Sequence, residues 1–292
     1  MKKFVGRLKD GNSVLIFSES NKNLALIENG FGFPVIDTDV EKKFQPDYKL
    51  ADDEWFYVDL NADDKALMMA PYLPTVESTA DVNNIVSDQY KELAVLYLAS
   101  KDSDGKEKII FNRIFNKFYI TSKIFLKFIA SGEAAVSTEE NVVEFNSNVD
   151  AYWDDATSKL YFKSYSTIKP LFKGIDKFYR SATSEEVASF INSEFFKVEE
   201  SFKSEKLGER ALKHIAGIID EKSIDFSDVA VRKKYNEYAK GYSESGVAIA
   251  EDGKFILTKA SDLTHVINLL QERYYTSQIT NEKRVAHSTS NI

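Results

Sequence analysis

The sequence contains no cysteine. Structural disulfides, zinc sites built on thiolates and cysteine nucleophiles are therefore excluded within the chain. Histidine is scarce too, and His214, His265 and His287 lack the spacing of a metal site. No phosphate-binding loop, dinucleotide fingerprint or nucleophile elbow occurs either. We therefore expect neither a metal nor a cofactor.

Long hydrophobic runs are also missing. No stretch of about 18 apolar residues occurs, so the sequence predicts no membrane-spanning helix. The first residues, MKKFVGRLKD, reach a glycine and charged residues at once, so we expect no secretory signal. The lack of cysteine does not determine the compartment, but it fits a reducing cytosol.

Apolar and aromatic residues are plentiful by contrast. Hydrophobic residues make up 43% of the chain and aromatic residues 13%, which predicts a packed globular protein instead of a disordered one. The excess of phenylalanine and tyrosine fits stacking surfaces and equally fits an AT-rich genome. No internal repeat or low-complexity linker divides the chain.

The clearest local pattern is an alternation in residues 149–163. Every second residue from Val149 to Trp153 is apolar, residues 155–158 are turn formers, and the alternation resumes over 160–163. Alternation with a period of two, interrupted by a short polar turn, predicts a β-hairpin with one face buried.

The rest of the N-terminal half also predicts strands and turns. Two apolar runs, 14–17 and 24–27, are separated by a turn-like segment and predict an opening β-hairpin. Another hairpin is predicted over 93–115, because the strong turn sequence DSDG occupies 102–105. With further strands expected over 119–129, the pattern predicts a mostly antiparallel sheet of about eight strands.

Helical patterns dominate after residue 163. Apolar residues recur at helical spacing over 168–175, and Thr183 followed by Glu186 is a capping box that predicts a helix start. Further helices are expected over 205–220, over 226–240 and after Ser261, with a small hairpin over 247–257.

Strands first and helices second is the α+β pattern, and we predict that fold class. The expected organisation is a strand-rich, mostly antiparallel region over 1–163 and a helix-rich region with a small hairpin over 164–280. A polar tail, 281–292, follows.

Several short motifs follow one another in the order seen in one family. A strand ends in Asp-Ala-aromatic at 149–153, and KLYF follows at 159–162. The later motifs are Leu171-Phe172, Phe178-Tyr179, Ala182-Thr183, Glu186-Val187, Phe190-Ile191, Leu269-Leu270 and SQIT at 277–280. Over most of residues 55–285 the sequence resembles the B component of the bacterial Kiwa anti-phage defence system.

The resemblance implies a cytoplasmic, non-enzymatic effector or adaptor that forms homo-oligomers and binds DNA. It also implies a partner, a small transmembrane A component, which would recruit the protein to the inner face of the membrane without direct insertion. The family offers no catalytic motif to place on this chain, so we expect no catalytic residues.

One stretch gathers positive charge in a chain whose net charge is −8. Basic residues interleaved with aromatic ones are typical of a nucleic-acid surface, since cations meet phosphates and rings stack on bases. Amphipathic strands, with aromatic side chains inward and lysines in water, give the same pattern. The two interpretations are compatible if the lysine face binds. Within 106–127 only Glu107 is acidic, and the basic residues are Lys106, Lys108, Arg113, Lys117, Lys123 and Lys127.

A second basic cluster, Arg232, Lys233 and Lys234, lies within the helix expected over 226–240. Such a helix face suits phosphate contacts, although lysines on a helix surface are commonly only solvated. We predict that these two clusters bind DNA without sequence preference, because no helix-turn-helix or zinc finger is present.

Two other functions stay open. A protein-interaction module would dock on the membrane partner through an apolar or aromatic face without contacting DNA. A metal-dependent nuclease would need acidic residues on a strand followed by a motif such as Glu-x-Lys. Asp150 and Asp155 ahead of Lys163 come nearest to that motif, but its acidic residue on the second strand is missing.

Overall fold

The chain forms two compact units. Unit 1 comprises Met1–Phe44 and Asp52–Asp176, and unit 2 comprises Gln45–Ala51 and the chain from Lys177 onward. Unit 1 contains an eight-stranded sheet and unit 2 is mainly helical, so the predicted α+β class is confirmed. The structure, a computed structural model, describes residues 1–46, 48–73, 87–115, 119–120, 123–128, 134–139, 142–143, 148–222 and 224–286.

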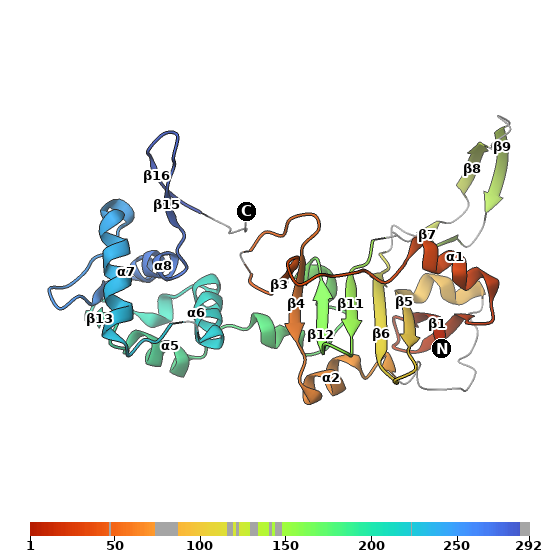
Figure 1. Cartoon of the computed structure of the whole chain (residues 1–292), viewed down its shortest axis with the longest axis horizontal. Helices are drawn as coiled ribbons and strands as arrows, with labels where there is room; N and C mark the ends of the chain where they lie inside the picture. Colours follow the sequence, from red (N-terminus) through yellow and green to blue (C-terminus); the bar gives the residue numbers. More distant parts are fainter. Residues whose placement is uncertain are drawn as a thin grey trace. The chain divides into compact units, whose positions relative to one another are not determined.

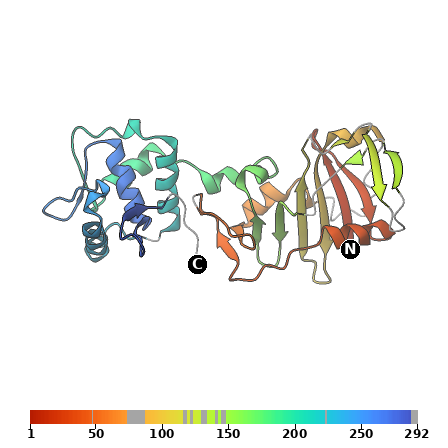
Figure 2. The ribbon, with the colours of Figure 1, turned by 90° about the horizontal axis from the view of Figure 1, so that it is seen from above.

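The sheet of unit 1 has the strand order β2-β1-β5-β6-β11-β12-β4-β3 (Figure 1). Neighbouring strands are antiparallel except β3 and β4, which are parallel. Seen from above, the order runs from red through yellow and green to orange (Figure 2). The strands are β1 (Lys2–Leu8), β2 (Ser13–Ser18), β3 (Glu41–Lys43), β4 (Trp55–Asp59), β5 (Leu93–Lys101), β6 (Glu107–Arg113), β11 (Ala151–Asp154) and β12 (Lys159–Phe162).

Two predicted hairpins are confirmed. β5 and β6 pair on either side of the turn at Asp102, whose carboxylate accepts hydrogen bonds from the backbone N–H groups of Asp104 and Lys106 at 3.0 and 2.8 Å. β11 and β12 pair on either side of a second turn, where the carboxylate of Asp154 accepts from the N–H of Ala156 at 3.0 Å. Aspartate suits such turns because its short side chain bonds the backbone two residues later.

The opening hairpin is built differently from the prediction. β2 pairs with β1, and residues 24–27 belong to helix α1 (Lys22–Gly30), so the predicted strand there is wrong. The side chain of Asn21 accepts a hydrogen bond from the N–H of Asn23 at 2.9 Å and caps this helix. An apolar run of four residues is compatible with the period of a strand and with that of a helix, and here the helix cap at Asn21 favours the helix.

One face of the central strands is covered by an aromatic layer. Tyr72, which follows helix α2 (Ala62–Met69), lies edge-on to Phe111 of β6 with ring centroids 4.8 Å apart. Phe172, which follows helix α4 (Tyr165–Ile168), meets the same ring at 5.1 Å. Aromatic side chains of this size contribute a large share of the buried apolar area of a core.

The opposite face is buried as well, so the prediction of one buried face is wrong. Tyr152 and Tyr161 stack with centroids 5.7 Å apart, and Phe33 packs edge-on against Tyr152 at 6.3 Å. Their hydroxyls donate to the carboxylates of Asp154 and Glu41, both at 2.9 Å. Tyrosine satisfies the alternating pattern as a polar residue and still packs its ring in the core.

Further strand pairs belong to unit 1. β8 (Lys123–Phe128) pairs antiparallel with β9 (Ala134–Glu139), and β7 (Tyr119–Ile120) pairs with β10 (Val142–Val143).

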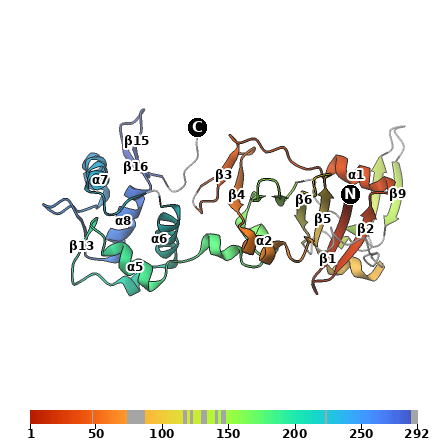
Figure 3. The ribbon, with the colours of Figure 1, turned by 60° about the horizontal axis from the view of Figure 1, so that its bottom comes forward.

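Unit 2 is organised around helix α8 (Ala260–Leu270), which lies between α6 (Glu209–Glu221) and α7 (Val229–Gly241) (Figure 3). The predicted capping box starts α5 (Ser184–Ile191): the hydroxyl of Thr183 accepts from the N–H of Glu186 at 3.2 Å. Two short strand pairs complete the unit. They are β13 (Phe196–Val198) with β14 (Phe255–Leu257), parallel, and β15 (Tyr274–Thr276) with β16 (Lys283–Val285), antiparallel.

Candidate nucleic-acid interface

A row of residues across three strands places two arginines on one face of the sheet. The register of β1 and β5 sets Arg7 opposite Val95, and the register of β5 and β6 sets Val95 opposite Arg113. Directly opposite residues lie on the same face, and neighbouring strands lie about 4.8 Å apart, so the two arginine backbones are about 10 Å apart. The two arginine side chains therefore leave the same face of the sheet, and the distance between their backbones is one that a single ligand can span.

These arginines line a cleft of about 630 Å³ at the margin of the aromatic layer. Its walls come from the end of β1, the turn after it, β5, the end of β6, and the segments that follow α2 and α4. Among the residues that the structure describes, no aspartate or glutamate lines this cleft. We call it the basic cleft, and the cations that line it are Arg7, Lys9, Arg113, Lys169 and Lys173.

Arg7 is held in place by an aromatic ring and a carbonyl group. Its guanidinium lies 5.5 Å from the ring centroid of Tyr72, and Nη1 donates to the carbonyl oxygen of Pro71 at 3.0 Å. Gly11, at a φ of +94°, takes the left-handed turn conformation that suits glycine. A Cβ atom at Gly11 would lie 3.4 Å from Nη2 of Arg7, so the turn packs directly beside the guanidinium.

Arg113 is held in a similar way. Its guanidinium lies 4.7 Å from the ring centroid of Phe115, and Nη1 is 3.5 Å from the carbonyl oxygen of Thr167. Its backbone N–H donates to the carboxylate of Asp150 at 2.7 Å. Burial raises the pKa of Asp150, although this hydrogen bond and the arginine charge both lower it. Among the members of the predicted basic stretch whose side chains the structure describes, Arg113 is thus the one that lines the cleft.

The three lysines of the cleft differ in their partners. Lys9 lies 3.7 Å from the carboxylate of Glu92, and Lys169 lies 2.8 Å from that of Asp176. Within the described part of the chain, no carboxylate lies at ion-pair distance from Lys173, Arg7 or Arg113. Lys9 also donates to the carbonyl oxygen of Lys91 at 2.7 Å. Arg7, Arg113 and Lys173 are therefore the cleft cations that an anion meets without displacing one of these carboxylates.

Tyr72 connects the cleft to the core. Its hydroxyl donates to the carbonyl oxygen of Leu171 at 2.9 Å, and its ring contacts Tyr97 as well as Phe111. Burial raises the pKa of Tyr72 more than the nearby charge of Arg7 lowers it, so the hydroxyl stays protonated at neutral pH. The ring therefore serves as a neutral, fixed support for the guanidinium.

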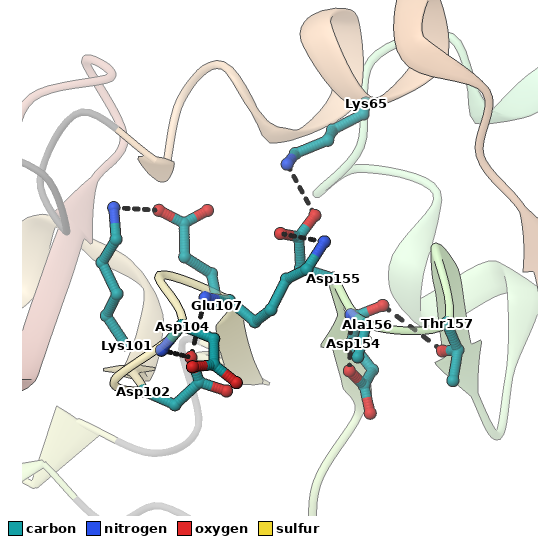
Figure 4. A network of polar contacts seen from close by, with 10 residues as sticks. Lys65, Lys101, Asp102, Asp104, Glu107, Asp154, Asp155, Ala156 and Thr157 are labelled. Atoms are coloured by element: carbon teal, nitrogen blue, oxygen red, sulfur yellow. Dashed lines mark hydrogen bonds and ion pairs between the residues drawn. The ribbon is translucent and has the colours of Figure 1, made fainter.

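Lys106 and Lys108 do not line the cleft and belong to a place where two hairpin turns meet, at which the backbone N–H of Asp155 donates to the carbonyl oxygen of Glu107 at 2.9 Å. Figure 4 shows the two turns, labelled at Asp104 and at Asp155, next to each other. Nζ of Lys106 lies 3.9 Å from Asp155, which also pairs with Lys65 at 2.6 Å. Nζ of Lys108 lies 3.7 Å from Asp154. We call this group the hairpin-end network. Its lysines face carboxylates, and this lowers the local positive charge that the sequence stretch implied.

The remaining predicted residues of that stretch are only partly within the described chain. Lys117 lies outside the described residues. The register of β8 and β9 sets Lys123 opposite Glu139 and Lys127 opposite Ala135, while their side chains are not among those described.

The second predicted cluster separates on α7. Arg232 is 9% exposed, and its guanidinium donates to the carbonyl oxygens of Glu194 and Asp252. Lys233 and Lys234 are exposed to solvent. The arginine thus holds two loops together, and the two lysines are the members of the predicted cluster that remain at the surface.

Sequence reasoning missed four of the five cleft cations, namely Arg7, Lys9, Lys169 and Lys173. They are far apart in the sequence, and only the strand register and the segment after α4 bring them together. A weak signal exists at Arg7, where a charged residue occupies a strand position two residues after the fully buried Val5.

In the described part of the chain, no group of three or more histidine, aspartate and glutamate side chains is arranged to hold a metal ion. No helix among the described residues is long and apolar enough to cross a membrane.

Comparison of the chain with protein-family models, with curated proteins and with solved structures finds no match.

Proposed function

We propose that the chain binds the phosphate backbone of DNA at the basic cleft. The observation that supports this most directly is a cleft lined by five cations, with no carboxylate among its described lining residues. The net charge of the chain is −8, so this local excess of positive charge is opposite in sign to the charge of the whole molecule. A local field of this kind attracts a polyanion in spite of the overall negative charge.

The geometry of the two arginines suits phosphodiester groups. A guanidinium presents a planar fork of N–H donors that matches two oxygens of one phosphate. Both forks rest on aromatic rings, Tyr72 and Phe115, so their side chains have already lost much of their rotational freedom. Binding therefore costs less conformational entropy than it would with free surface lysines.

Contacts of this kind read the backbone and not the bases. Phosphate contacts set the position of a protein on DNA but carry no sequence information. The cleft is built from strand ends and loops, without a recognition helix among its walls. We therefore expect sequence-tolerant binding that weakens steeply as salt rises.

In the cell, we propose a non-enzymatic effector or adaptor of bacterial anti-phage defence. The resemblance of residues 55–285 to the Kiwa B component supports this proposal. The same resemblance leads us to propose that the protein forms oligomers and acts with a small transmembrane partner. Lys117, Lys123 and Lys127, and Lys233 and Lys234 on α7, remain proposed contacts in addition to the cleft.

A gel-shift titration with paired variants tests the cleft. We expect Arg7→Gln with Arg113→Gln to weaken binding to a 30-base-pair duplex at least tenfold, and the slope of log affinity against log salt to fall by about two. The matched control is Lys106→Gln with Lys108→Gln, which removes the same charge from the hairpin-end network. We expect this control to change the affinity less than about threefold, since its lysines already face carboxylates.

Thermal unfolding followed by circular dichroism checks that both double variants are folded. Equal losses in the two double variants would contradict the cleft and favour general electrostatic attraction. Wild-type protein that fails to shift DNA at low salt would reject DNA binding itself and leave the protein-interaction module.

A further inference from the structure

A second cavity, of about 350 Å³, lies in unit 2. Its walls come from the residues that end α7, from α8, and from the two strands β15 and β16. It belongs entirely to unit 2 and shares no residue with the basic cleft. Cavities of about 300–1,000 Å³ are of the size that holds small ligands. We call it the tyrosine cavity.

Two stacked tyrosines form one wall of this cavity. The rings of Tyr242 and Tyr274 have centroids 5.7 Å apart and an interplanar angle of 28°. Tyr238 packs edge-on against Tyr242 at 5.2 Å, and its own hydroxyl donates to the backbone carbonyl oxygen of Tyr274. Tyr274 is only 8% exposed. The wall is therefore rigid, and a flat ring stacks on such a wall at little entropic cost.

Polar groups from α8 lie beside the aromatic wall. The hydroxyl of Tyr274 donates to the carbonyl oxygen of His265 at 3.2 Å. Burial raises the pKa of Tyr274, while hydrogen bonding with the side chain of Asn268 lowers it. An amide carries two donor hydrogens and an acceptor oxygen, so Asn268 keeps hydrogen-bonding capacity for a ligand.

The loop after α7 fits closely around His265. Gly246 has a φ of +82°, and a Cβ atom there would lie 3.2 Å from Nε2 of His265. A side chain at Gly246 would strain the backbone and press on the imidazole. The glycine thus fixes the position of the ring against the loop.

Positive charge enters the cavity from β16. Lys283 and Arg284 both line it, and no aspartate or glutamate does so among the described residues. Arg284 follows Lys283 in β16 and lies opposite Tyr275, so its side chain starts from the other face of the strand pair, where its guanidinium pairs with Glu282 at 2.6 Å. Lys283 has no carboxylate within ion-pair distance in the described chain. An anionic group bound here therefore meets at least one uncompensated cation.

We infer that the tyrosine cavity binds a nucleotide. The base would stack on the wall formed by Tyr242 and Tyr274, Asn268 would hydrogen-bond its edge, and Lys283 would hold its phosphate. A simple anion would leave the aromatic wall unused, and an apolar ligand would leave the charge of Lys283 facing it. This inference stands apart from DNA binding at the basic cleft, since a different unit carries it.

Isothermal titration calorimetry on the full chain tests the inference. The probes are AMP, GMP, CMP and UMP, with the four matching nucleosides and inorganic phosphate as partial ligands. We expect at least one monophosphate to bind, and its nucleoside and inorganic phosphate to bind at least about tenfold more weakly. If none of the four binds at up to about 5 mM, or if phosphate alone binds as tightly, the inference is overturned.

Variants assign the parts of the ligand to the parts of the cavity. We expect Lys283→Ala to weaken the bound monophosphate about tenfold and to leave the binding of its nucleoside unchanged. Asn268→Ala is expected to weaken both ligands. The matched control is Lys206→Ala, which removes the same charge from an exposed position of unit 2 and should change neither. An equal effect of the control and the cavity variant would contradict a local phosphate contact.

Discussion

The basic cleft and the hairpin-end network contain the same kinds of side chain in opposite arrangements. In the cleft, Arg7 and Arg113 are 106 positions apart in the chain and come onto one face through the register of three strands. In the network, Lys106 and Lys108 are neighbours in the chain and face Asp155 and Asp154. Positive charge that is dense along the sequence is thus compensated in space, and charge that is scattered along the sequence is concentrated. Sheet register, more than local composition, decides where positive charge gathers on the described surface.

The largest expected effect concerns the three lysines of the basic stretch whose side chains the structure does not describe. We expect Lys117→Glu, Lys123→Glu and Lys127→Glu together to weaken DNA binding at least about 100-fold and to leave the fold intact, if these lysines extend the cleft surface. Filter retention of labelled duplex measures the effect. The matched control reverses three exposed lysines of unit 2, Lys197, Lys206 and Lys240. Retention that falls equally in the two triple variants would mean that only the overall charge matters.

A smaller effect is expected from opening the hairpin-end network. Asp155→Asn removes the partner of Lys65 and Lys106, so the network becomes more positive. We expect DNA affinity to rise roughly two- to fivefold and the free energy of unfolding to fall by about 1 kcal/mol. Gel shift and urea denaturation measure the two changes.

A gain that persists when Lys106→Gln is added to Asp155→Asn would show that the network does not touch DNA. The basic cleft would then differ from the hairpin-end network in DNA contact as well as in charge. A loss of affinity in Asp155→Asn would contradict this difference, since the carboxylate would then support binding.

The smallest expected effect comes from Asp150, beside Arg113. Because burial raises the pKa of Asp150, the folded chain holds this proton more tightly than the unfolded chain does. Its contribution to the free energy of unfolding is therefore largest at low pH and falls as pH rises from the ordinary aspartate value of about 3.9 through the folded pKa. Asp150→Asn removes this decline, because an amide does not titrate in that range.

Urea denaturation of the wild type and Asp150→Asn between pH 4 and pH 8 measures the difference, which should grow with pH and then level off. We also expect DNA affinity at neutral pH to rise about twofold, because a carboxylate next to Arg113 is gone. Parallel pH profiles would mean that Asp150 titrates alike in the folded and unfolded chain.

Much of the fold could be predicted from the sequence where turn and cap chemistry is explicit. Asp102 and Thr183 mark their turn and helix start through hydrogen bonds that depend only on local spacing. The strand expected over 24–27 failed because a short apolar run has no clear period, and the cap at Asn21 was the deciding signal. Tyr152 and Tyr161 occupy the polar positions of the alternating pattern but are buried. The alternation therefore gave no sign that the second face of the sheet is covered.

The candidate site was less predictable. Arg113 was expected to contact DNA and lies in the cleft, but its partner Arg7 is contributed by a strand that pairs with β5 through long-range register. Local sequence carries no information on such a pairing until the strand order is known. Arg232 looked like a surface charge, yet its 9% exposure and its two carbonyl partners place it in the packing of unit 2.

Segment Gln45–Ala51 is covalently part of the first half of the chain and spatially part of unit 2. The chain therefore passes between the units three times, after residues 44, 51 and 176, whereas a simple two-domain chain does so once. A protease cut after residue 176 would leave the upstream fragment anchored through this loop, in which Gln45 donates to Glu221 at 3.1 Å. The fragments would co-elute until denaturant is added, and the second half expressed alone would miss a piece of its own surface.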